Sequence, residues 1–167
     1  MTLNGRGMRR QSYEVTLAAL SIYPDINVIV GVNDQAALGA LDALHAAHRP
    51  VEEVLLATFG LEGSAAKQLL MERRPRSVGV AMFPEFIGRV CANVAVKAYN
   101  GLPLPDQVIT PTAVVTCETL SDYYHLAAGY WQIQGEMIKT LPAEHWTPEA
   151  AILNPDSQTR LPRRIDF

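Results

Sequence analysis

Val28–Leu44, VIVGVNDQAALGALDAL, is the stretch that decides the fold. It begins with an apolar, β-branched run and continues, after Asn33 and Asp34, with leucines at helical spacing among alanines. This pattern predicts a buried strand followed by a helix, with Asp34 as the N-cap residue. In open parallel sheets, ligands bind at the carboxyl ends of the strands. The turn at Asn33 and Asp34 is therefore the first place to look for a site.

The same strand, turn and helix pattern occurs twice more along the chain. Short apolar runs predict further strands at 54–59 and 78–82, and helices are expected at 12–23, 34–48, 64–74 and 84–99. Strands that alternate with helices at this spacing indicate right-handed βαβ units. The predicted fold class is α/β, a three-layer αβα arrangement with a mainly parallel sheet covered on both faces.

The regular alternation of predicted strands and helices ends near residue 100. We predict a Pro-rich connector over 102–112, a strand at 113–117, a helical turn at 120–124, a helix over 125–141 and little regular structure from 142 onward. Two tryptophans, Trp131 and Trp146, lie in this part, and we expect them to cover the sheet or to meet a partner surface. The aromatic-rich tail is thus predicted to be irregular.

Composition bounds the class of protein. The chain has 167 residues, is 49% hydrophobic and 19% charged, and has a net charge of -3, which is typical of one soluble globular domain. No apolar run is long enough to predict a membrane-spanning helix. Lys and Arg form no long basic run, so we expect this segment to contact no nucleic acid. The N-terminus lacks the apolar core of a signal peptide, so any export signal of the parent protein is expected outside this chain.

Neither a cofactor nor a metal is predicted. The two cysteines, Cys91 and Cys117, match no metal or redox spacing, and we expect them to be buried thiols. No glycine-rich nucleotide-binding motif follows a predicted strand. Asp34, Glu62 and Glu85 are either a carboxylate cluster for acid–base chemistry or Mg²⁺, or helix caps and solvated loop charges. No nucleophile is recognisable beside a base, so we expect no catalytic residues and no enzyme.

Taken together, the three strand-end turns resemble those of a known family. The quoted segments are YPDINVIVGVNDQAALGALDAL, FGLEGS, VAMFPEFIG and NGLPLPDQVITPTAVVT. They resemble the carboxyl-terminal lobe of type I periplasmic sugar-binding proteins, a fold that also forms the effector-binding domain of lactose-repressor-like regulators. The resemblance covers residues 9–124, a partial lobe without its first strand, and residues 125–167 form an extension or linker.

The resemblance implies a sugar or polyol as ligand, held at the carboxyl ends of the strands. It assigns the ligand contacts to Asn33, Asp34, Glu62 and Met82. Glu62 stands where the family has an aspartate, and Met82 stands where ribose-type members often have a polar amide. Planar amides and carboxylates suit the neighbouring hydroxyls of a sugar. The ligand is therefore expected to be less hydroxylated near Met82, or the site to have decayed.

The resemblance also implies partners, because such proteins clamp their ligand between two lobes. The expected partners are the missing amino-terminal lobe of the same parent and, for a transport protein, a membrane permease. Three interpretations stay open: a periplasmic or extracellular transport protein, a cytoplasmic regulator, and a degenerate lobe that serves as a protein-interaction module. A module of this last kind is expected to self-associate through Trp131 and Trp146.

Overall fold

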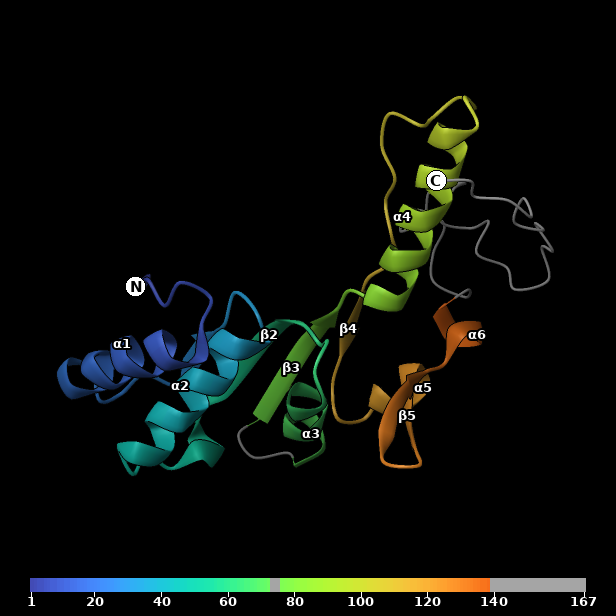
Figure 1. The fold of residues 1–167 in the computed structure, drawn as a ribbon. Helices are drawn as coiled ribbons and strands as arrows, with labels where there is room; N and C mark the ends of the chain where they lie inside the picture. Colours follow the sequence, from blue (N-terminus) through green and yellow to red (C-terminus); the bar gives the residue numbers. More distant parts are fainter. Residues whose placement is uncertain (73–75, 139–167) are drawn as a thin grey trace.

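The computed structural model describes residues 1–72 and 76–138 (Figure 1). In chain order the elements are α1 (Arg9–Ile22), β1 (Val28–Val30), α2 (Asp34–Ala46), the 3-10 turn η1 (Val51–Glu53), β2 (Leu55–Gly60), α3 (Ser64–Glu72), β3 (Arg76–Ala81), α4 (Pro84–Tyr99), β4 (Ala113–Val115), α5 (Leu120–Tyr123), β5 (Tyr124–Ala127), β6 (Tyr130–Ile133) and α6 (Gly135–Ile138). The three predicted strand–helix units are all present.

One four-stranded sheet forms the centre of the chain, in the order β1-β2-β3-β4. The first three strands are parallel, and β4 pairs with β3 in the antiparallel direction. Because β1, β2 and β3 run the same way, the turns that follow them lie at one edge of the sheet. The predicted α/β class with a mainly parallel sheet is confirmed.

Helices α2 and α3 cover one face of this sheet. Leu56 of β2 is fully buried there against α2 and α3, with Leu38 and Leu69 as neighbours. Strand register places a second set of apolar side chains on the opposite face, and these are exposed: Val28, Val30, Leu55, Phe59 and Val114. We expected helices on both faces, whereas in the part of the chain that the structure describes this second face is open.

Helix α4 begins with Pro84 at its first turn, as predicted, and ends at Tyr99 before Gly101, whose φ of +66° is left-handed. It extends away from the sheet (Figure 1), and its buried residues are Phe86 and Val90 near its start. This placement overturns one prediction, because Cys91 is exposed, while Cys117 is half-buried. A helical pattern identifies the apolar stripe of a helix and does not reveal how much of it finds a partner.

The predicted helix over 125–141 is wrong. The strands Tyr124–Ala127 and Tyr130–Ile133 form the antiparallel hairpin β5–β6. Within the described part of the range 125–141, only Gly135–Ile138 is helical. Ala128 and Gly129 both have positive φ, the combination that a two-residue hairpin turn requires. Trp131 and Ile133 pack against the core cluster that includes Leu61 and Phe83, while Trp146 lies outside the described residues.

Helices α1 and α2 pack side by side at the end of the molecule opposite the hairpin (Figure 1). Their close approach depends on Gly39, where an added Cβ would lie 2.1 Å from the carbonyl oxygen of Arg9. The same Arg9 forms a two-pronged ion pair with Asp42, with Nε–Oδ2 at 2.7 Å and Nη2–Oδ1 at 2.9 Å. The hydrogen bonds from Arg9 hold the pKa of Asp42 below its usual value, against a smaller opposing effect of burial.

We expect Gly39→Ala to lower the free energy of unfolding by about 1–3 kcal/mol, because α1 must move to admit the methyl group. The matched control is Gly88→Ala in α4, where nothing lies within 4 Å of the added Cβ. Alanine is the better helix former, so this control should gain about 0.5–1 kcal/mol. Urea unfolding followed by circular dichroism measures both, and a stabilised Gly39→Ala would show that the helices are not in this contact.

Asp42→Asn should lower the unfolding free energy at about pH 7 by about 0.5–1 kcal/mol, since the pair is partly exposed. The stabilisation by a carboxyl of lowered pKa is present above its unfolded pKa and is lost as the pH falls through the folded value. The difference between wild type and variant should therefore shrink as the pH is lowered from neutral to below the lowered pKa of Asp42. Glu14→Gln, in the exposed pair with Arg10 inside α1, is the control and should change little at either pH.

Candidate functional site

The carboxylate of Asp34 joins the ends of β1 and β2. Its Oδ1 accepts hydrogen bonds from Thr58 Oγ1 at 2.6 Å and from the Leu61 amide at 3.2 Å. Its Oδ2 accepts from the Glu62 amide at 2.8 Å. Asp34 is only 8% exposed, and three donors from the next strand and its turn satisfy it. The Asp34 carboxylate therefore holds the ends of the two strands together, and little of its surface is left for contact with a ligand.

Asn33, and not Asp34, is the N-cap residue of α2. Its side-chain oxygen accepts from the Ala36 amide at 2.9 Å, while Asp34 is the first residue of the helix. Either residue suits the cap position by type, and only the positions of β2 and Thr58 decide between them. The Asn33 amide group donates to the carbonyl oxygen of Gly7 at 3.0 Å. This side chain, predicted to bind hydroxyls, is thus engaged by the amino-terminal segment.

The turn after β2 carries Glu62, whose side chain is exposed at the edge. Leu61 precedes it with a φ of +54°, in the left-handed region that a leucine rarely adopts. Asp34 holds the amides of both residues, and Lys67 Nζ donates to the carbonyl oxygens of Leu61 at 2.6 Å and of Glu62 at 3.2 Å. The backbone of this turn is therefore held both by Asp34 and by Lys67. These contacts fix the position of the Glu62 backbone, from which its side chain extends.

The turn after β3 adds a half-buried Met82 and a buried Phe83 to the same edge. The Met82 amide donates to the carbonyl oxygen of Gly60 at 3.2 Å, so this turn is tied to the one that carries Glu62. The Phe83 ring packs at 5.7 Å from the Tyr123 ring and 6.0 Å from the Tyr124 ring, measured between centroids. The edge thus combines polar and apolar surface, with aromatic rings beneath it.

Of the four predicted ligand residues, Asp34 and Glu62 are brought together directly, and Met82 is joined to them through Gly60. Sequence reasoning missed Thr58, Lys67 and Tyr124, all of which are buried and belong to this network. No sequence signal identifies them, because a threonine in a strand, a lysine in a helix and a tyrosine after a helical turn are all ordinary.

The electrostatic character of the edge is acidic. The carboxylates of Glu85, Asp34 and Glu62 all interact electrostatically with the buried side chains of Lys67 and Tyr124. Burial lowers the pKa of Lys67, an effect that the three carboxylates oppose, and burial followed by the same carboxylates raises the pKa of Tyr124. Across the described residues, no group of three His, Cys, Asp or Glu side chains is arranged to hold a metal ion.

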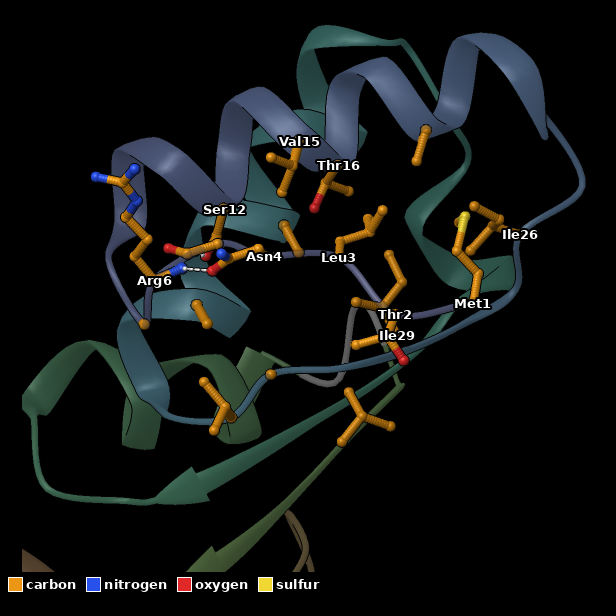
Figure 2. A pocket seen from close by; sticks show the side chains of 18 of the residues that line it. Met1, Thr2, Leu3, Asn4, Arg6, Ser12, Val15, Thr16, Ile26 and Ile29 are labelled. Carbon is orange, nitrogen blue, oxygen red and sulfur yellow. Dashed lines mark hydrogen bonds between the residues drawn. The ribbon is translucent and has the colours of Figure 1, made fainter.

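A separate cavity of about 580 Å³ lies between the amino-terminal residues, α1 and β1 (Figure 2). Its wall combines apolar side chains, such as Leu3, Val15 and Ile29, with polar ones, such as Ser12 and Thr16. The Arg6 amide donates to Asn4 Oδ1 within the amino-terminal segment. None of the four predicted ligand residues lines this cavity. It is therefore distinct from the strand-end edge.

Comparison with known proteins explains this geometry. No protein-family model matches the chain. A curated relative, the ribose import binding protein RbsB of Bacillus subtilis, is 27% identical over 94 residues, which are 56% of this chain and 29% of that protein. A solute-binding protein of Bacillus halodurans, solved with bound myo-inositol, is 28% identical with a TM-score of 0.63, over 70% of this chain and 39% of that one.

The chain has the fold of one lobe of a type I periplasmic sugar-binding protein. The Caulobacter myo-inositol binding protein, solved with myo-inositol, agrees, with 26% identity and a TM-score of 0.62 over 69% of this chain and 39% of that protein. This lobe spans under a third of the length of its curated relative and about two fifths of the solved structures. In the described residues no helix is both long and apolar enough to cross a membrane.

Asp34→Asn should destabilise the lobe by about 1–3 kcal/mol, because the amide group places a donor against donors of Thr58 and the Glu62 turn. Urea unfolding at neutral pH measures the loss. Asp25→Asn, at an exposed aspartate before β1, removes the same charge and should leave the unfolding free energy nearly unchanged. Equal stability of the two variants would contradict the role assigned to Asp34.

Proposed function

We propose that this lobe binds a neutral sugar or polyol at the carboxyl ends of β1, β2 and β3, as part of a substrate-binding protein for ABC transport. The observation that carries the proposal is the convergence of Asp34 and Glu62 at this edge, with Asp34 Oδ2 2.8 Å from the Glu62 amide. Asp34 is buried at this edge, whereas the side chain of Glu62, which is one methylene longer than an aspartate, is exposed there. Relatives solved with bound myo-inositol support the class of ligand.

The acidic edge favours neutral hydroxylated ligands over anionic ones. A carboxylate accepts hydrogen bonds and has none to donate, so Glu62 suits the hydroxyls of a polyol. Glu85, also exposed, adds a second negative charge near the same place, while Lys67, the nearby cation, is buried and engaged by carbonyl oxygens. Phosphorylated or carboxylated sugars would therefore be repelled.

We further infer that Asn33 and Met82 complete the contact surface, and that the lobe is not an enzyme. A ligand hydroxyl at Asn33 competes with the Gly7 carbonyl for the amide group. Asp34 cannot act as a general base, since three donors already occupy its carboxylate. The partners proposed for the whole protein are a second lobe, which closes on the ligand, and a membrane permease. Use as the effector domain of a regulator remains the alternative.

The test is an amide NMR titration of the full 167-residue chain with myo-inositol and D-ribose at millimolar concentration. We expect shifts at Asn33, Glu62 and Met82 with a neutral polyol and none with myo-inositol 1-phosphate. Glu62→Gln should weaken binding by about 10- to 100-fold, the value of a charge-assisted hydrogen bond. Glu52→Gln, an exposed glutamate at the opposite end of the sheet, is the matched control and should bind as wild type.

Two results would decide against sugar binding at the ends of the strands. Shifts that are confined to the cavity of Figure 2 would move the ligand away from the strand ends. An absence of shifts, together with self-association in sedimentation equilibrium, would favour the protein-interaction module, which the open apolar face of the sheet supports.

A further inference from the structure

Lys67 of α3 is a buried cation whose contacts are unusual. Only 4% of it is exposed, and its Nζ donates to the carbonyl oxygens of Leu61 and Glu62 at 2.6 and 3.2 Å. On its other side the ammonium lies 4.3 Å from the centroid of the Tyr124 ring. A buried charge is retained when its partners compensate for the lost water, and here two carbonyl dipoles and an aromatic face do so.

Tyr124 supplies its ring to this contact and not its hydroxyl. The residue is 2% exposed and its ring packs at 6.0 Å from Phe83. The hydroxyl has no hydrogen-bond partner among the described residues. Since a buried hydroxyl without a partner is unfavourable, the position is explained by the aromatic face beneath Lys67.

The turn that Lys67 binds would not keep its shape unaided. Leu61 has a φ of +54°, a conformation that costs free energy for a residue with a branched side chain. Asp34 holds the two amides of this turn, and Lys67 holds the two carbonyl oxygens. Opposite charges thus bind opposite ends of the Leu61–Glu62 peptide group, and each also binds a peptide group next to it.

We propose that Lys67, held in place by the ring of Tyr124, is a positioning residue for Glu62. The hairpin β5–β6 begins at Tyr124, the last residue of the segment that resembles sugar-binding lobes, and thereby sets the shape of the ligand edge. The turn-holding role stands on the contacts alone, and only its consequence for affinity rests on the proposed function.

The first measurement is amide hydrogen exchange of the full chain without ligand. Lys67→Met keeps the aliphatic stem and removes the charge, so the Leu61 and Glu62 amides should exchange about 10-fold faster relative to Ala57 in β2. Tyr124→Leu should have the same effect, and the double variant should add little to either single change. Tyr124→Phe keeps the ring and should exchange as wild type.

Val54→Ala controls for a loss of stability without a change at the edge. Val54 is fully buried just before β2, at the far end of that strand, so this variant should be destabilised while the exchange ratio stays at the wild-type value. A ratio that rises equally in Val54→Ala, or that stays unchanged in both Lys67→Met and Tyr124→Leu, would overturn the proposal. Should Lys67→Met fail to fold, Tyr124→Leu against Tyr124→Phe decides alone.

The second measurement is the affinity for myo-inositol by NMR titration. Lys67→Met and Tyr124→Leu should each weaken binding about 10-fold, with Tyr124→Phe and Val54→Ala unaffected. If the wild type binds no polyol, the proposed function is refuted. The exchange ratios still test whether Lys67 and Tyr124 hold the turn at Leu61 and Glu62. If the wild type binds and both variants bind equally well, the positioning of Glu62 is refuted.

Discussion

The buried carboxylate of Asp34 is the interaction on which the candidate site depends. It is the first residue of α2, and through Thr58, Leu61 and Glu62 it binds the end of the neighbouring strand and the turn beyond it. Parallel strands are joined to each other by backbone hydrogen bonds, but these end where the strands end. One ionised side chain continues the connection into the loops, where a ligand would lie.

The turn that Asp34 binds is also bound by a positive charge, that of Lys67. Asp34 accepts from the N–H groups of Leu61 and Glu62, and Lys67 donates to the carbonyl oxygens of the same two residues. The ring of Tyr124 lies against the Lys67 ammonium. Groups that are immobilised before a ligand arrives lose less entropy when it binds. For the proposed ligand, a turn that is already ordered would lower the entropic cost of binding, although Lys67 itself is buried.

Periodicity in the sequence was sufficient for the strand and helix order up to Tyr99, and the Asn33–Asp34 turn was located correctly. The division of labour between these two side chains was not predictable, since it depends on where Thr58 and Leu61 lie in space. A lysine in a helical pattern is ordinarily solvated, so burial of Lys67 has no sequence signature. The hairpin that begins at Tyr124 was missed because the apolar residues there also have helical spacing. The turn at Ala128 and Gly129, where both residues have positive φ, ends the first strand of the hairpin.

The open face of the sheet has a consequence for the life of this chain in a cell. Alternate residues of β1 and β2, such as Val30 and Phe59, present an apolar surface, and among the described residues β1 is an edge strand of the sheet. Surfaces of this kind are what chaperones bind and what drives edge-to-edge aggregation of incompletely assembled proteins. An uncovered face of this kind would make the chain a substrate for chaperones and proteases, so a partner that covers Val30 and Phe59 would also protect the chain from degradation.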